Sequence, residues 1–234
     1  MDIQEIRLER SGIGYIRMMA GTVLGHAAAF YIFAWGVGNL QSWIYYGAFI
    51  LINILNLVLL YKYNLPLLNE RGKMKKDIAK EEKIIVPLML AFAFFIPSIV
   101  AGLEYGLTKK SFATPLLILI GLALLIASSV LENWAMLVNR HFEKNIRIQS
   151  DREQTVVTSG PYKYIRHPGY LGYILRLVAF PLMLGLVWSI LPVGIGIIIY
   201  VVRTHIEDNI LKKELNGYLE YTQRTKYRII PLIW

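Results

Sequence analysis

Residues 160–172, GPYKYIRHPGYLG, join a charged loop to a long apolar run and therefore lie where water meets a membrane. The opening Gly-Pro pair predicts a turn, and His167 is pushed out of helical geometry because it precedes Pro168. Pro168 suits the first turn of a helix, where its missing N–H loses no hydrogen bond. The free N–H groups of residues 169–171 would then point back toward the loop and favour an anion there. A binding site and a simple interfacial anchor of aromatic and basic residues both fit this composition.

The whole chain has the composition of a polytopic integral membrane protein. Of its 234 residues, 56% are hydrophobic and 18% are charged. The lack of cysteine excludes disulfides, thiolate metal sites and a cysteine nucleophile. The first apolar run is too long for a cleaved signal peptide, so we expect none. The net charge of +9 is confined to particular loops, which favours membrane topology over a nucleic-acid partner. His141, His167 and His205 are too scattered to predict a metal site.

Apolar run lengths predict an all-α fold with four spanning helices, a C-terminal helical hairpin and a cytoplasmic C-terminal helix. The hairpin, residues 170–202, is short for two crossings of about 20 residues each. It either just crosses or turns back before crossing. We treat residues 1–138, the N-terminal helices, and 139–234, the cofactor-binding and catalytic part, as one integrated domain. The predicted segments are a surface helix in 1–17, spans at 18–37, 42–61, 84–103 (kinked by Pro87 and Pro97) and 114–138, a solvated basic loop without chemistry at 62–83, and a polar helix from Arg203 to about Tyr221.

Basic residues alternate strongly between the two ends of the predicted bundle. The N-terminus, the 62–83 loop, the 139–167 loop and the C-terminal segment carry 22 Lys and Arg, whereas the connections at the other end carry 2. The positive-inside rule therefore places both termini and the 139–167 loop in the cytoplasm, in a plasma or internal membrane.

Among Asp, Glu, Lys, Arg and His, three residues fall within the predicted spans and the hairpin. Glu132 and Arg176 both lie roughly 13 Å below the cytoplasmic face, because each is nine residues from the loop. Unpaired charges at that depth are costly, so we predict that the two pair and tie the fourth span to the hairpin. The alternatives for Arg176 are that it extends toward the membrane surface or contacts the substrate. We expect His26 to be hydrogen-bonded to a neighbouring helix.

Residues 158–162, TSGPY, followed by Arg166-His167-Pro168-x-Tyr170-x-Gly172, resemble the isoprenylcysteine carboxyl methyltransferase and phospholipid methyltransferase family of integral-membrane enzymes. The resemblance extends from about residue 139 to the C-terminus. It includes Arg203 followed four residues later by an acidic pair, the Tyr218-x-x-Tyr221 motif and the Arg228-x-x-Pro231 ending. The sequence departs from the family pattern in two places: Asp208 replaces the second Glu, and the segment 215–218 is one residue shorter.

The resemblance implies S-adenosylmethionine as the cofactor and an amphiphilic or lipid-like substrate drawn from the membrane. Catalytic roles would fall to Arg203, Glu207 and His167, with Arg203 also holding the substrate. A small intrahelical Arg203–Glu207 salt bridge is the alternative. Cofactor binding would involve Gln154, Thr155, Val156, Val157, Tyr162, His167, Pro168, Gly169, Tyr170 and Glu207, with Gln149 as a weaker candidate.

Several functions remain open from the sequence. Carboxyl O-methylation of the isoprenylcysteine type is the family's named activity, and N-methylation of a phospholipid fits the same residues. Two further candidates are a nicotinamide-dependent membrane reductase of related architecture and a non-catalytic lipid-binding protein.

Overall fold

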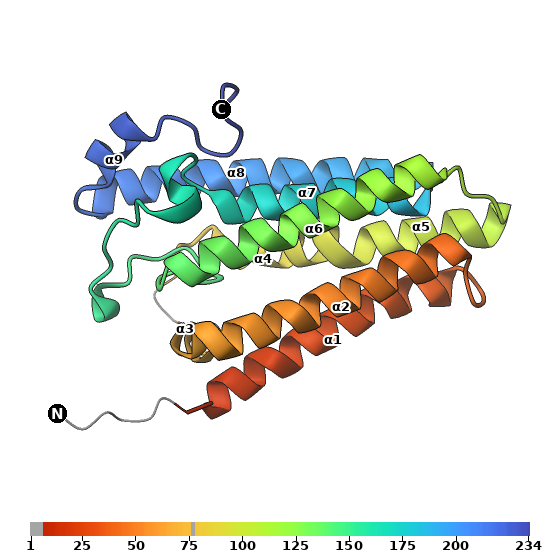
Figure 1. Cartoon of the computed structure of the whole chain (residues 1–234), viewed down its shortest axis with the longest axis horizontal. Coiled ribbons are helices and arrows are strands. Elements are labelled where there is room, and N and C mark those ends of the chain that lie inside the picture. The colour runs from red at the N-terminus through yellow and green to blue at the C-terminus, as the bar shows by residue number, and fades with distance from the viewer. Residues whose placement is uncertain (1–6, 76–77) are drawn as a thin grey trace.

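The computed structural model describes residues 7–75 and 78–234, and every regular element in these residues is a helix. Figure 1 shows the long helices running side by side along one axis. The helices are α1 (Arg10–Phe33), α2 (Leu40–Tyr63), α3 (Leu65–Arg71), α4 (Glu82–Leu90), the π-helix η1 (Ala91–Phe95), α5 (Ile96–Thr108), α6 (Pro115–Val138), the 3-10 turns η2 (Ser150–Arg152) and η3 (Gly160–Lys163), α7 (Pro168–Leu184), the 3-10 turn η4 (Val187–Ser189), α8 (Ile190–Glu214) and α9 (Tyr218–Arg224).

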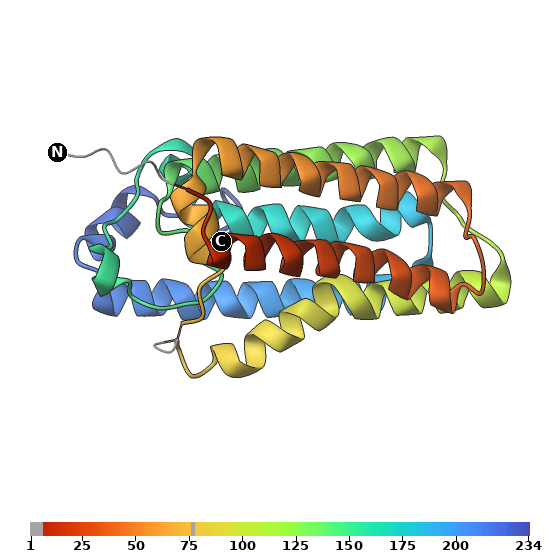
Figure 2. The same cartoon turned by 90° about the horizontal axis from the view of Figure 1, so that it is seen from below.

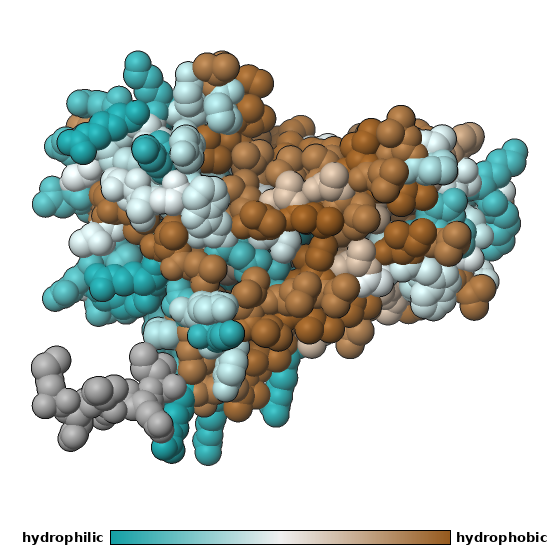
Figure 3. Space-filling model, in the orientation of Figure 1, coloured by the Kyte–Doolittle hydropathy of each residue, from teal (hydrophilic) through white to brown (hydrophobic). Residues whose placement is uncertain are grey.

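Helix length and hydropathy confirm the polytopic membrane fold. Among the described residues, five helical stretches are long and apolar enough to span a membrane: α1, α2, Glu82–Thr108, α6 and Val187–Glu214. Helix α7 is apolar but has 17 residues. Figure 3 shows hydrophobic surface over the middle of the bundle and hydrophilic surface gathered at its two ends. α3, α9 and the loop between α6 and α7 lie together at one of these ends (Figures 1 and 2).

The C-terminal hairpin crosses the whole length of the bundle. Its turn lies at Gly185, whose φ of 62° is a left-handed conformation that favours glycine. The Gly185 carbonyl accepts the Phe112 N–H at 2.9 Å, in the connection between α5 and α6. The buried Glu104 carboxylate accepts the N–H groups of Val187 and Trp188 at 3.0 and 2.7 Å. The hairpin tip is therefore fixed at the end of the bundle opposite α3 and α9.

Some predicted boundaries are wrong. Helix α1 begins at Arg10, so described residues 10–17 belong to the first span and not to a separate surface helix; residues 1–6 lie outside the described part. The third span runs from Glu82 to Thr108, and the π-helix η1 interrupts its hydrogen bonding just before Pro97. A proline ring crowds the carbonyl four residues earlier, which a wider turn relieves. The polar C-terminal helix is two helices, because Gly217 adopts a φ of 79° between α8 and α9.

The intramembrane polar residues are paired as predicted. Arg176 Nη2 on α7 donates to Glu132 Oε1 on α6 at 2.5 Å, and both side chains are buried. His26 Nδ1 lies 2.7 Å from the Phe94 carbonyl, and its Nε2 lies 3.2 Å from the Tyr45 hydroxyl. The first contact ties α6 to α7, and the second ties α1 to its neighbours.

Breaking the Glu132–Arg176 pair should destabilise the bundle. Either Glu132→Gln or Arg176→Gln leaves a charge buried alone and is expected to cost about 3–5 kcal/mol of unfolding free energy. The double variant should cost less than the sum of the two, by a coupling of about 0.5–3 kcal/mol. Chemical unfolding in detergent measures the unfolding free energy of the wild type, the two single variants and the double variant. Simple additivity would show that the two side chains do not interact.

Candidate active site

One large cavity lies at the end of the bundle that carries α3, α9 and the 139–167 loop. Its volume is about 570 Å³, within the range of about 300–1,000 Å³ that small-molecule sites occupy. It extends from the loop down between the helices to residues of α1, α2 and α4. The structure places every residue of the predicted site on its wall: Gln149, Gln154, Thr155, Val156, Val157, Tyr162, His167, Pro168, Gly169, Tyr170, Arg203 and Glu207.

Helix α7 starts as the sequence predicts, but its first amides are partly used. His167 precedes the helix with non-helical angles (φ −126°, ψ 62°), and Pro168 occupies the first turn. The N–H groups of Tyr170 and Leu171 both donate to the His167 carbonyl, at 3.1 and 3.3 Å. The expectation of free donors at these two positions is therefore wrong. Gly169 leaves room for the Phe142 ring, because a Cβ there would lie 2.5 Å from the Phe142 Cζ and the ring would have to shift.

Glu207 and Tyr170 present an acid and an aromatic ring to the cavity together. The Tyr170 hydroxyl donates a hydrogen bond to Glu207 Oε2, across from α7 to α8. The Arg203 guanidinium lies over the Tyr170 ring, 5.5 Å from its centre. A carboxylate and an aromatic face are the groups that bind an organic cation. This corner of the cavity can therefore hold a positively charged ligand.

Arg203 forms its ion pair with Glu82 and not with Glu207. Its Nε donates to Glu82 Oε1 at 2.9 Å and its Nη2 to Glu82 Oε2 at 2.8 Å, while Nη2 also reaches the Lys144 carbonyl at 2.6 Å. The Glu82 side chain is buried and accepts the Ile146 N–H at 3.0 Å as well. The alternative prediction, an intrahelical salt bridge between Arg203 and Glu207, is therefore wrong. The sequence did not predict a role for Glu82, because Glu82 lies 121 residues from Arg203 along the chain.

Asp208 is a buried hub that braces the site from behind. It is fully buried and does not line the cavity. Its carboxylate accepts both Nε and Nη2 of Arg166, at 2.8 and 3.1 Å, and the Tyr218 hydroxyl at 3.0 Å. Arg228 Nε and Lys212 Nζ lie 2.9 and 2.8 Å from it. The sequence indicated an acidic pair at 207–208, but only the structure separates a cavity-facing Glu from a bracing Asp.

The C-terminal segment closes over the 160–167 loop. Arg166 Nη1 donates to the carbonyls of Thr225 and Lys226 at 2.8 and 2.7 Å. The Tyr221 hydroxyl donates to the Tyr162 carbonyl at 2.6 Å. Burial raises the pKa of Tyr162 and raises that of Tyr221 to about 12, so both phenols remain neutral at physiological pH. The Tyr-x-x-Tyr motif thus supports the loop that carries the site.

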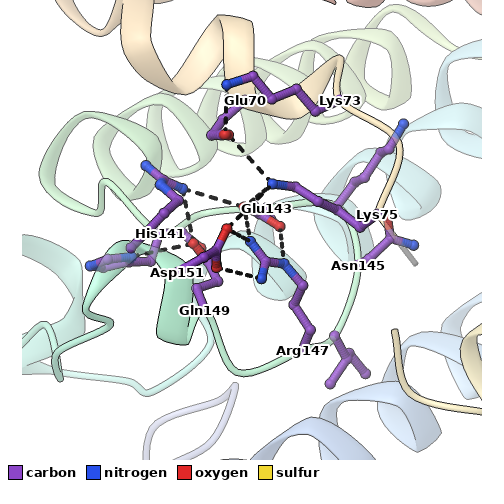
Figure 4. A network of polar contacts seen from close by, with 12 residues as sticks. Glu70, Lys73, Lys75, His141, Glu143, Asn145, Arg147, Gln149 and Asp151 are labelled. Carbon is purple, nitrogen blue, oxygen red and sulfur yellow. Dashed lines mark hydrogen bonds and ion pairs between the residues drawn. The ribbon is translucent and has the colours of Figure 1, made fainter. Parts of the chain in front are cut away.

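A polar network fastens the 139–154 loop to the end of α3. Figure 4 shows Glu143 and Asp151 on either side of the Arg147 guanidinium, with bonds of 2.7–3.3 Å. Lys75 reaches from beyond α3 to Glu70 at 3.4 Å and to Glu143 at 3.8 Å. The prediction of a merely solvated loop at 62–83 is therefore wrong, because this segment forms part of the site's frame.

The described residues could hold S-adenosylmethionine by the chemistry of its separate groups. Glu207 and the Tyr170 ring fit its sulfonium and ammonium charges. The His167 ring stacks against that of Tyr170, with 5.7 Å between the ring centres, and an imidazole N–H can donate to a carboxylate. The loop residues Val156 and Val157 supply an apolar wall for a purine.

Removing the Glu207 charge should weaken cofactor binding without unfolding the protein. Glu207→Gln is expected to reduce S-adenosylmethionine affinity about 10-fold or more, because a charge-assisted contact is worth about 1.5–3 kcal/mol. Tyr170→Phe should have a smaller effect, through the loss of the hydrogen bond that orients Glu207. Calorimetry measures both, with Glu214→Gln as the control, since Glu214 is exposed at the end of the same helix. Wild-type affinity in both variants would remove Glu207 from the cofactor site.

Comparison with known proteins supports the resemblance seen in the motifs. The family model for the isoprenylcysteine carboxyl methyltransferase family matches residues 119–213. The fold is similar to a solved structure of the eukaryotic intramembrane Ras methyltransferase, an isoprenylcysteine carboxyl methyltransferase, with a TM-score of 0.52 and 18% identity over 97% of this chain and 99% of that one. A search of curated proteins gave no significant match.

Proposed function

We propose that this chain, a membrane methyltransferase, transfers a methyl group from S-adenosylmethionine to a carboxylate on an amphiphilic molecule. The premise is the match of residues 119–213 to the isoprenylcysteine carboxyl methyltransferase family. The acceptor class is of the isoprenylcysteine type, and the reaction takes place at the cytoplasmic face of the membrane.

The observation that carries this proposal is the two-part character of the cavity. Its outer part is lined by the polar residues of the 139–167 loop and by Glu207 and Arg203. Its inner part is lined by side chains of the spanning helices, such as Met18, Leu57 and Met89. A site of this kind suits a ligand with a charged head and an apolar chain, with the chain arriving from the bilayer.

The chain's own residues would act mainly by positioning. S-adenosylmethionine supplies an electrophilic methyl group when bound. A carboxylate attacks it directly and needs no general base. The barrier falls when the two reactants are held in line and water is excluded. Glu207 and Tyr170 would orient the cofactor's positive end, and Arg203, held by Glu82, would aim the acceptor carboxylate.

Cofactor and acceptor binding test the proposal separately. Calorimetry of the purified protein should give saturable binding of S-adenosylmethionine and none of NADPH. With S-farnesyl-N-acetylcysteine as acceptor, a base-labile methyl ester should form. Binding of NADPH alone would indicate a reductase, and methylation of phosphatidylethanolamine in place of the thioether acid would indicate a phospholipid N-methyltransferase.

The orientation is tested by cysteine labelling, which the absence of native cysteine makes clean. Ser150→Cys, in the 139–167 loop, should react only with cytoplasmic reagent. Lys110→Cys, an exposed position in the connection at the opposite end, should be labelled from outside. External labelling of Ser150→Cys would reverse the proposed orientation.

A further inference from the structure

The inner part of the cavity is not uniformly apolar, although an aliphatic chain would be its simplest occupant. Arg176 and Glu132, the ion pair between α7 and α6, both line it. Arg176 lies six residues beyond Tyr170 on α7, which places it about 9 Å deeper along the helix axis. A pair of charges therefore faces the space into which the substrate chain would extend.

Arg176 has more donors than its protein partners use. A guanidinium carries five N–H donors. Within residues 7–75 and 78–234, the hydrogen bond found for its side chain is the one from Nη2 to Glu132 Oε1, and its buried Nε has no partner. The rings of Phe49 and Tyr173 flank the guanidinium at 5.6 and 5.7 Å, and their faces do not replace hydrogen-bond acceptors. An unmatched donor at this depth is costly, because neither lipid nor an apolar chain can accept its proton.

The neighbouring groups keep this part of the cavity polar and donor-rich. Glu132 Oε1 already accepts from both Arg176 and Ser128, so its negative charge is engaged. The amide side chains of Asn53 and Asn56 line the same cavity. Asn53 Nδ2 already donates to the Phe49 carbonyl, and Asn56 Oδ1 accepts from Ser129 and Asn133, so the guanidinium of Arg176 is the group that a purely hydrocarbon chain would leave without an acceptor. A chain that carries an oxygen at this depth would supply an acceptor to Arg176 Nη1, for which the described residues provide no hydrogen bond and which, unlike Nε, is not among the buried atoms.

We propose that Arg176 forms a second polar subsite, which makes the protein prefer, over an unbroken hydrocarbon or prenyl chain, a substrate chain with a hydrogen-bond-accepting oxygen about 9 Å from the methylated group. This inference rests on the proposed function, since it uses the position of the reacting head beside Tyr170 and Arg203. The accepting oxygen has two chemical sources: a keto group within a fatty chain, or the ester carbonyl of a glycerolipid.

The test uses stearate and a set of oxostearates that differ only in the position of the keto group. Binding to the full-length protein in detergent, with S-adenosylmethionine present, is measured by thermal shift and by competition. We expect the isomer with its keto group about 9 Å from the carboxylate to bind about 10-fold more tightly than stearate. Isomers with the keto group next to the carboxylate or at the far end should bind like stearate. A second arm compares the binding of a lysophosphatidic acid with that of its alkyl ether analogue. It tests whether an ester carbonyl can supply the accepting oxygen.

The variant for this test is Glu132→Gln combined with Arg176→Gln, which removes the subsite's charges without leaving either one unpaired. It should bind all oxostearates within about 2-fold of stearate. Glu104→Gln is the matched control, because it removes a buried carboxylate that lies outside the cavity, and it should retain the preference. Equal affinity of the wild type for every chain in both arms, or the same preference in the double variant, would overturn the subsite. Failure of the proposed function would appear separately, as an absence of S-adenosylmethionine binding.

Discussion

Asp208→Asn is expected to destabilise the C-terminal part of the protein by about 3–5 kcal/mol. The substitution removes the anion that Arg166, Arg228 and Lys212 share, and it leaves those cations without a buried counter-charge. The segment beyond α8 should then release from the 160–167 loop, because Arg166 also holds the backbone of that segment. Chemical unfolding in detergent measures the loss, and limited proteolysis should show earlier cleavage after residue 214.

The same substitution, Asp208→Asn, should also weaken cofactor binding, even though Asp208 does not line the cavity. His167 Nε2 lies 3.4 Å from Asp208 Oδ1, so the side chain loses its support. We expect S-adenosylmethionine affinity in Asp208→Asn to drop at least 10-fold, a loss of about 1.4 kcal/mol. Asp151→Asn is the control: this acid pairs with Arg147 but is exposed, and should cost at most about 1 kcal/mol. Unchanged stability and affinity in Asp208→Asn would show that the hub is not a brace.

Arg203 should separate cofactor binding from turnover. Arg203→Lys keeps the charge but loses the planar fork that holds Glu82 and that fixes Nη1, the donor left for the acceptor carboxylate in the proposed reaction. We expect normal S-adenosylmethionine affinity and a much lower kcat/KM. Arg203→Ala should cost on the order of 2–4 kcal/mol of transition-state stabilisation with a carboxylate acceptor. Steady-state kinetics with S-farnesyl-N-acetylcysteine and with phosphatidylethanolamine compares the two acceptor classes, and an amine acceptor should tolerate lysine better.

Glu82 provides the control for a structural role of Arg203. Glu82→Gln keeps the side-chain shape and leaves Arg203 partly paired, so it should lower kcat/KM less than Arg203→Ala does. If Arg203→Ala folds and turns over both acceptors at the wild-type rate, then Arg203 serves only to hold Glu82 and the 143–146 loop.

Features that depend on local sequence physics could be predicted. The length of each apolar run identified the spans, and Pro168 marked the start of α7. Lys and Arg counts separated the two ends of the bundle. The Glu132–Arg176 pair followed from depth alone, since two opposite charges at one level of a membrane have few other partners. The motif residues of 154–170 and 203–207 share one cavity.

Contacts between distant segments could not be read in this way. How far the hairpin extends depended on contacts at its tip, where Glu104 accepts the Trp188 N–H and the Gly185 carbonyl accepts the Phe112 N–H, and the sequence does not indicate either pairing. The pairing of Arg203 with Glu82 joins residues 121 positions apart. The roles of Glu207 and Asp208 were decided by helix rotation, because adjacent residues on a helix point about 100° apart. Composition and periodicity determine that a helix forms and which length of it enters the membrane. Packing against other helices determines which polar groups of the helix find partners, because those partners are set by three-dimensional position and not by spacing along the chain.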